Sequence, residues 1–173
     1  MPEVYVAAGS NVAPEENLAR AVAELAREFP GARFSPWYRN RAVGFEGDDF
    51  INLVTGFSTA LPVRRVLERL HAIETACGRG RAAPRWAPRT MDLDVLLYGD
   101  LVCHEPGLEL PRPDLLKCAY MLGPLAALAP EVVHPLAGLT IGELWRRFDR
   151  AAHPLEPLTS RCCDPHPPRE PGP

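Results

Sequence analysis

Two aspartates, Asp92 and Asp94, lie two residues apart in the otherwise apolar segment 91–97. Side chains alternate along a β-strand, so both carboxylates of such a strand point to the same side, with their Cα atoms roughly 6.6 Å apart. Acids this close repel unless a cation lies between them. Magnesium prefers oxygen ligands and commonly takes one or two carboxylates together with substrate phosphates. An isolated Asp-x-Asp is nevertheless more typical of an ordinary strand with a solvated polar face.

A basic segment directly precedes this pair. Residues 78–89 contain four arginines and no acid: Arg79, Arg81, Arg85 and Arg89. Arginine binds phosphate oxygens in bidentate fashion and stays charged, and Trp86 adds a flat face for stacking. A solvated basic loop or a nucleic-acid patch would also explain the cluster, but the net charge of −3 argues against nucleic acid. Acids and arginines this close together favour magnesium with a polyphosphate, because phosphoryl-type transfer needs positioning and charge neutralisation.

The bulk sequence places these residues in one small enzyme-sized domain. The chain has 173 residues, enough for one hydrophobic core. No apolar run approaches a membrane span, and no secretory signal is visible. The five cysteines are odd in number and lack Cys-x-x-Cys spacing, which favours reduced thiols. We expect a cytoplasmic monomer without nucleic-acid or membrane partners. The chain also lacks the P-loop motif.

Hydrophobic periodicity predicts the elements that must position the candidate residues. We expect strands at 4–8, 50–58 and 91–98, a weaker one at 33–38, and helices at 14–29, 62–76, about 114–122 and from Thr140. The third helix is expected to break at Gly123-Pro124. The order predicts an α+β, ferredoxin-like sandwich, a mostly antiparallel sheet with helices packed on one face and long functional loops. We assign 1–150 to this domain and 151–173 to a Pro-rich, disordered tail.

Alternation within two predicted strands separates core side chains from candidate site side chains. On the last strand, Leu93, Val95 and Leu97 face the core, opposite the two aspartates. On the strand 50–58, Asn52 shares a face with Phe50 and Val54. A polar residue on an otherwise apolar face needs a hydrogen-bond partner, which favours a binding role for Asn52. Phe50 alone would be an ordinary core aromatic.

The run 85–96, RWAPRTMDLDVL, resembles the signature of 6-hydroxymethyl-7,8-dihydropterin pyrophosphokinases at every restricted position of that pattern. Three further segments are similar to the same family in the same order: Gly9-Ser10-Asn11, Phe50-Ile51-Asn52, and the region from Tyr120 to Glu131. The resemblance covers about 4–148. It implies transfer of pyrophosphate from ATP to the pterin hydroxymethyl group, with release of AMP, in folate biosynthesis.

The resemblance also implies residue roles on the nucleotide side. Asp92 and Asp94 would hold two magnesium ions that bridge the ATP phosphates, and Arg79 and Arg89 would neutralise phosphate charge during transfer. The same nucleotide would contact residues of the closing loop, its base and the segment near 112: Glu74, Arg81, Trp86, Arg89 and Arg112.

On the pterin side, Asn52 would hydrogen-bond the pterin edge and Tyr120 would stack on its ring. Phe50 lies beside Asn52 on the same strand face, and Val43 would contribute main-chain contacts. Asp92 would lie within reach of the same substrate. Without the resemblance, Tyr120 reads as an ordinary core aromatic.

The chain departs from the family at four positions. Arg112 stands where histidine is frequent, Cys118 where an arginine usually touches the triphosphate, His71 where glutamine is common and Arg41 where proline is common. Arg112 or Lys117 could supply the missing charge. These departures keep open a catalytically weak paralogue that binds pterin or nucleotide in a regulatory role, and a γ-phosphate kinase is a further alternative.

Overall fold

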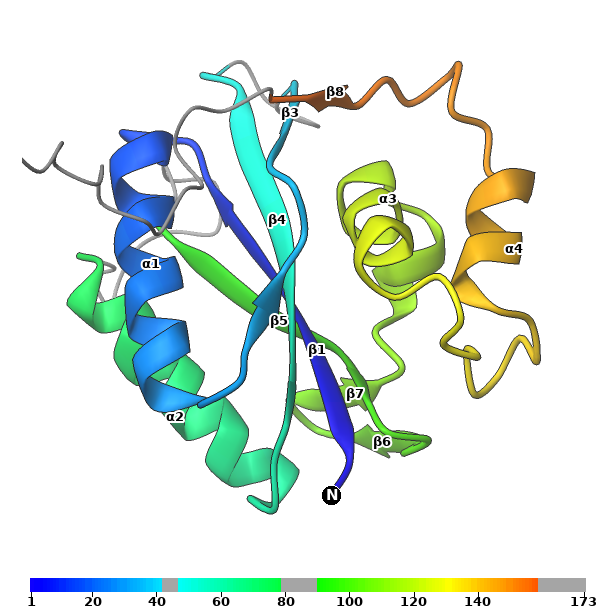
Figure 1. The fold of residues 1–173 in the computed structure, drawn as a ribbon, viewed down its shortest axis with the longest axis horizontal. Helices are drawn as coiled ribbons and strands as arrows, with labels where there is room; N and C mark the ends of the chain where they lie inside the picture. The colour runs from blue at the N-terminus through cyan, green and yellow to red at the C-terminus, as the bar shows by residue number, and fades with distance from the viewer. Residues whose placement is uncertain (42–46, 79–89, 159–173) are drawn as a thin grey trace, which may run out of the picture.

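The computed structural model describes residues 1–41, 47–78 and 90–158, which form a three-layer α/β/α domain. The strands are β1 (Glu3–Ser10), β2 (Arg33–Phe34), β3 (Tyr38–Asn40), β4 (Phe50–Ser58), β5 (Asp92–Tyr98), β6 (Cys103–Glu105), β7 (Leu108–Leu110) and β8 (Glu156–Pro157). The helical segments are α1 (Pro14–Glu28), α2 (Val63–Ala76), the 3₁₀ turn η1 (Pro113–Leu116), α3 (Ala119–Leu128) and α4 (Ile141–Arg147). The central sheet is antiparallel, with the order β5-β1-β4-β3-β8 and β2 also pairing with β4 (Figure 1).

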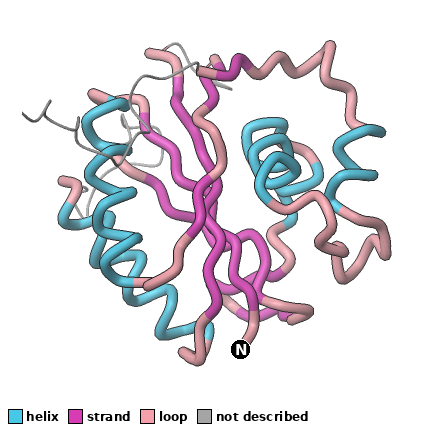
Figure 2. Tube along the Cα trace, in the orientation of Figure 1, coloured by secondary structure: helices cyan, strands magenta, loops and turns pink. Residues whose placement is uncertain are grey.

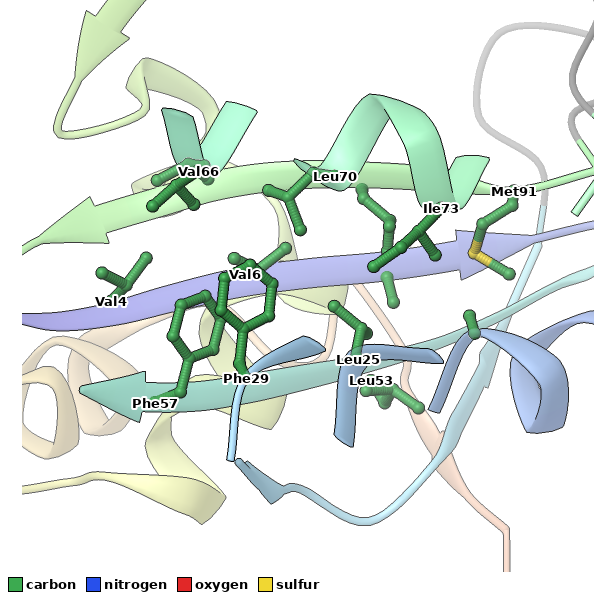
Figure 3. Close-up of a cluster of buried hydrophobic side chains, with 14 of the residues drawn as sticks. Val4, Val6, Leu25, Phe29, Leu53, Phe57, Val66, Leu70, Ile73 and Met91 are labelled. Carbon is green, nitrogen blue, oxygen red and sulfur yellow. The ribbon is translucent and has the colours of Figure 1, made fainter. Parts of the chain in front are cut away.

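Helices α1 and α2 cover one face of this sheet. Leu25 of α1 and Leu70 of α2 are fully buried among side chains of β1 and β4 (Figure 3). Phe29 at the end of α1 stacks on Phe57 of β4, with ring centroids 3.9 Å apart. Burying an aromatic side chain of this kind contributes on the order of 2–3 kcal/mol, so this face is a dry, stabilising core.

The opposite face is covered by α3, and α4 packs on the outer side of α3, which differs from our expectation of helices on one face (Figure 2). Leu122 and Leu125 of α3 pack on Tyr5 of β1 and Val54 of β4. The strands β1 and β4 carry apolar residues on both faces, so both faces must be covered to exclude water. The α+β, ferredoxin-like fold class is otherwise as predicted.

Strand β5 changes its facing partway along. Val6 of β1 pairs with Val95, but the next residue, Tyr5, pairs with Leu97, so Leu96 is an extra residue in β5. A bulge of this kind reverses the side-chain alternation beyond it. Leu93 and Val95 therefore lie in the core under α1 and α2, whereas Leu97 lies in the core under α3. Our assignment of Leu97 to the first of these faces was wrong for this reason.

Helix α3 runs through the Gly123-Pro124 pair at which we expected a break. The expected helix at about 114–122 is instead a 3₁₀ turn followed by a new helix. Proline removes one helical hydrogen bond, but the packing of an almost wholly buried helix outweighs that loss. Gly123 serves close packing: a Cβ there would lie 2.8 Å from Leu155 and 3.0 Å from the Trp145 ring.

The other predicted elements are confirmed within one or two residues. Helix α1 starts at Pro14, α2 ends at Ala76, and β4 spans 50–58. The weak strand at 33–38 is present as two pieces, β2 and β3. At the start of α4, Thr140 Oγ1 accepts from Glu143 N at 3.2 Å, and Glu143 Oε2 accepts from Thr140 N at 2.9 Å, which confirms the capping box.

Two features were not expected. Strands β6 and β7 form a separate hairpin after β5. Residues 151–158, the first part of the segment assigned to the tail, lie along the domain, where β8 pairs with β3 and Leu158 N donates to Trp37 O at 2.9 Å. The remaining tail residues lie outside the described ranges.

Within the described ranges, no helix combines the length and apolar character that a membrane span requires. The cysteines in those ranges are unpaired thiols: Cys77, Cys103 and Cys118.

Candidate active site

The two aspartates of β5 share one face of the sheet, as the alternation predicts. Asp94 pairs with Ala7 of β1, and Asp92 pairs with Gly9. Paired residues in an antiparallel ladder face the same side, and Ala7 belongs to the core under α3. Both carboxylates therefore lie on the α3 side, where each is half-buried. Pairing with β1 fixes the backbone of both aspartates, so the sheet sets the distance between their Cα atoms.

Glu74 of α2 supports this strand from the opposite side. Its side chain is buried, and Oε1 accepts from Leu93 N, between the two aspartates, at 2.8 Å. A buried carboxylate that accepts a backbone N–H holds that peptide firmly. In this structure Glu74 therefore positions β5, and its predicted contact with ATP stays a prediction.

Asn52 lies in the same cross-strand row as Asp92, with Gly9 between them. Gly9 pairs with Asn52 on one side and with Asp92 on the other. A Cβ at Gly9 would lie 2.4 Å from Asn52 Oδ1, so the missing side chain lets the amide lie across β1. Asn52 Nδ2 donates to Asn40 Oδ1 of β3. The buried amide thus has the partner that its place on an apolar face requires.

Asn40 is a site residue that our sequence reading missed. It connects Asn52 to a cavity of about 570 Å³ that is lined by residues of β3, α3 and the segment 151–158, among them Asn40, Arg41, Cys118, Tyr120 and His153. No local signal marks Asn40, because its contact with Asn52 depends on the β3–β4 register. The cavity is of the size that encloses a small ring system.

Tyr120 reaches this cavity from the first turn of α3. Burial raises the pKa of the Tyr120 hydroxyl, and its hydrogen bond to Cys118 adds to the shift. The phenol is therefore neutral at physiological pH and presents a polarisable ring face beside polar groups. Phe50, half-buried on β4, pairs with Asn40. The structure thus gathers Asn52, Phe50 and Tyr120 around Asn40.

Arg112 joins the site from the segment between β7 and η1. Its Nη1 lies 3.1 Å from Asp94 Oδ1, and its Nη2 lies 3.6 Å from Asp114 Oδ2. The guanidinium and both carboxylates are partly exposed, so each contact is individually weak. The Arg112 guanidinium thus lies next to Asp94 and Asp114 on the α3 side of the sheet.

The acidic pair suits a Mg²⁺ ion whose remaining coordination positions are filled by substrate phosphates and water. In the described part of the chain, no group of three or more His, Cys, Asp or Glu side chains converges to hold a metal. Asp92 and Asp94 could supply two hard oxygen ligands, which is the number that Mg²⁺ commonly takes from a protein when phosphates and water provide the rest. The donor set suits Mg²⁺ better than zinc, which favours nitrogen and sulfur.

Several predicted site residues lie outside the described ranges. These are Val43, Arg79, Arg81, Trp86 and Arg89.

Two histidines that lie beside apolar segments, His71 and His134, are not part of the candidate site. His71 is exposed on α2. His134 is buried, and its Nδ1 accepts from Leu136 N and Ala137 N, which is a structural role in the connection from α3 to α4.

Known proteins resemble this chain along most of its length. The family profile described as 7,8-dihydro-6-hydroxymethylpterin-pyrophosphokinase matches residues 5–130. A 2-amino-4-hydroxy-6-hydroxymethyldihydropteridine pyrophosphokinase of Synechocystis sp. is 38% identical over 156 residues, covering 88% of this chain and 80% of that protein. The protein of the same name from Aquifex aeolicus is 33% identical over 165 residues, covering 94% of this chain and 98% of the relative.

The fold is also found in solved structures. The Plasmodium falciparum HPPK-DHPS wild type with SDX-DHP aligns with a TM-score of 0.67 at 12% identity, over 84% of this chain and 44% of that one. This chain thus spans less than half the length of that longer protein. The profile match and the identities to the two bacterial relatives carry the assignment: the chain belongs to the 7,8-dihydro-6-hydroxymethylpterin-pyrophosphokinase family.

Proposed function

We propose that this protein transfers pyrophosphate from ATP to the hydroxymethyl group of 6-hydroxymethyl-7,8-dihydropterin and releases AMP, a step of folate biosynthesis. The observation that carries the proposal is the row formed by Asp92, Gly9 and Asn52 across three strands. It places an acidic cation site next to a buried amide within one antiparallel ladder. The relatives that bear the pyrophosphokinase name match the chain across this whole region.

On the nucleotide side, Asp92 and Asp94 would hold two Mg²⁺ ions together with the ATP phosphates. The bound metal would supply charge neutralisation and a template for the triphosphate. Arg112 lies at Asp94 and would add a guanidinium from the α3 side. Arg79, Arg81, Trp86 and Arg89 keep their predicted roles as further nucleotide contacts.

On the pterin side, Asn52 would hydrogen-bond the substrate edge, and its bond to Asn40 orients the amide for this. Tyr120 would stack on the pterin ring, with Phe50 beside the strand row and Val43 adding main-chain contacts. The acceptor hydroxyl oxygen forms a bond to the β-phosphorus of ATP and loses its proton to solvent, the bond from that phosphorus to the oxygen bridging to the α-phosphate breaks, and AMP leaves with that oxygen. Positioning of the acceptor oxygen in line with the leaving AMP is the main contribution of the protein.

The alternative of a catalytically weak, regulatory paralogue is not favoured, because the relatives that match this chain carry the pyrophosphokinase name. A cytoplasmic location and a monomeric state complete the proposal. The unpaired Cys77, Cys103 and Cys118 are consistent with a reducing compartment.

The test is AMP release with ATP, Mg²⁺ and the pterin alcohol, compared with Asp94→Ala. We expect turnover by the wild type and a loss of about a thousandfold or more in the variant, because a metal carboxylate is removed. Asp100→Ala, which removes an exposed carboxylate just after β5, is the matched control and should keep most activity. Release of ADP in place of AMP, or equal turnover by Asp94→Ala, would contradict the proposal.

A further inference from the structure

The backbone of Arg112 is fixed against the strand that carries the acidic pair. Its N–H donates to Leu96 O of β5 at 2.9 Å, and its carbonyl accepts from Leu115 N at 3.1 Å. Prolines flank it at positions 111 and 113, which restricts the backbone further. Any movement of the guanidinium therefore comes from side-chain rotation about a stationary Cα.

The guanidinium itself is incompletely satisfied. Nη1 contacts Asp94 at 3.1 Å and Nη2 lies 3.6 Å from Asp114, so the fork is divided between two carboxylates in place of a bidentate pair on one. Nε is buried and has no hydrogen-bond partner among the described residues. About a third of the Arg112 side chain remains exposed. A divided, partly exposed contact of this kind is readily exchanged for a better anion.

The positive charge of Arg112 at Asp94 opposes the close approach of a metal ion to this carboxylate. A divalent cation on the Asp94 oxygen that faces Nη1 would lie beside a permanent positive charge. Either the guanidinium leaves or the metal binds weakly. A metal–triphosphate complex differs from the free metal, because its phosphate oxygens offer the displaced guanidinium a new, bidentate partner.

We propose that Arg112 is a counter-ion of Asp94 in the nucleotide-free protein, competes there with divalent cations, and transfers to the triphosphate when metal and ATP bind together. The proposal rests on the metal role of Asp92 and Asp94 proposed above. In this role Arg112 weakens the binding of a metal ion alone and strengthens the binding of ATP together with the metal.

The first test titrates Mn²⁺ into the full-length, nucleotide-free protein and follows free Mn²⁺ by electron paramagnetic resonance. Arg112→Gln should bind Mn²⁺ about fivefold more tightly than the wild type, which is the upper range for a partly exposed ion pair. Arg112→Lys, with a charge but no fork, should fall between them. The matched control is Arg64→Gln, which removes the same charge from an exposed pair with Glu105 and should leave Mn²⁺ affinity unchanged.

The second test measures binding of α,β-methylene ATP with Mn²⁺ by calorimetry. Here Arg112→Gln should bind several-fold more weakly than the wild type, opposite in sign to the first test. A purely structural role would shift both affinities in the same direction, so equal directions overturn the proposal, as does unchanged Mn²⁺ affinity in Arg112→Gln.

Asp94→Asn separates this inference from the proposed function. If Asp94→Asn abolishes Mn²⁺ binding while Arg112→Gln leaves it unchanged, the metal site stands and the competition is refuted. If Asp94→Asn leaves Mn²⁺ binding unchanged, the metal role fails and the competition fails with it. Thermal unfolding of each variant confirms that the folded state is being compared.

Discussion

The two faces of the central sheet are built from the same strands but serve different purposes. Under α1 and α2, side chains such as Leu25, Phe57 and Leu70 form a dry core. Under α3, a similar apolar core occupies only part of the sheet, and the row through Asp92, Gly9 and Asn52 carries polar groups. In β5, one set of alternating side chains packs in the core while the intervening aspartates face the site, so a single strand serves both stability and chemistry.

The largest effect is expected from a substitution in the core under α1 and α2. Phe57→Ala removes the ring that stacks on Phe29 and leaves a cavity, so we expect a loss of about 3–5 kcal/mol in the free energy of unfolding. Turnover per folded molecule should stay close to that of the wild type, because Phe57 lies on the face opposite the aspartates. Urea denaturation and AMP release at low temperature measure the two effects. A loss of activity greater than the loss of folded protein would show that the two faces are not separable.

A substitution in the row through Asp92, Gly9 and Asn52 should instead affect substrate binding more than the stability of the fold. In Gly9→Ala, the new Cβ would lie 2.4 Å from Asn52 Oδ1, so the amide must move. We expect the KM for the pterin to rise about tenfold, with a smaller change in the KM for ATP, because Asn52 is proposed to hold the pterin edge. Steady-state kinetics with each substrate varied measures this. Gly56→Ala, whose new Cβ would lie 2.8 Å from the Tyr5 ring, makes a comparable close contact in the same sheet outside the site and is the control for a general glycine effect.

A smaller effect on activity is expected at Cys118, which lines the cavity beside α3. Cys118→Arg introduces a guanidinium at the position where the family resemblance predicts a phosphate-binding arginine. We expect a few-fold lower KM for ATP or a higher turnover, because arginine offers a bidentate donor to phosphate. An unchanged KM and kcat would mean that position 118 does not reach the triphosphate.

The smallest effect is expected on the pH dependence of stability, through His134 in the connection from α3 to α4. Burial lowers the pKa of His134 below its ordinary value of 6.5. As the pH falls through about 6.5, the unfolded state takes up this proton before the folded state does, so the free energy of unfolding declines from that pH downward. His134→Asn should lose this part of the pH dependence, which denaturation at pH 5 and pH 8 measures. An identical decline in both proteins would assign it to other groups.

Much of the fold could be predicted from local patterns. The apolar periodicity of 14–28 and 63–76, and the strand 50–58, are local properties of consecutive residues, and the structure has them within one residue. The common facing of Asp92 and Asp94 follows from alternation alone. The spacing of the acids, the preceding arginines and the family resemblance were sufficient to predict the chemistry.

Tertiary contacts decided what the local patterns could not. Leu97 changes face because β5 accommodates one extra residue against β1, and α3 passes through Pro124 because its surroundings bury it on nearly every side. Asn40 meets Asn52, and Arg112 meets Asp94, through pairings between residues that are far apart in the chain. The candidate chemical residues could be identified from the amino-acid sequence alone, since side-chain type and strand alternation are local properties. The partners of those residues depend on strand register and packing, which only the folded chain sets.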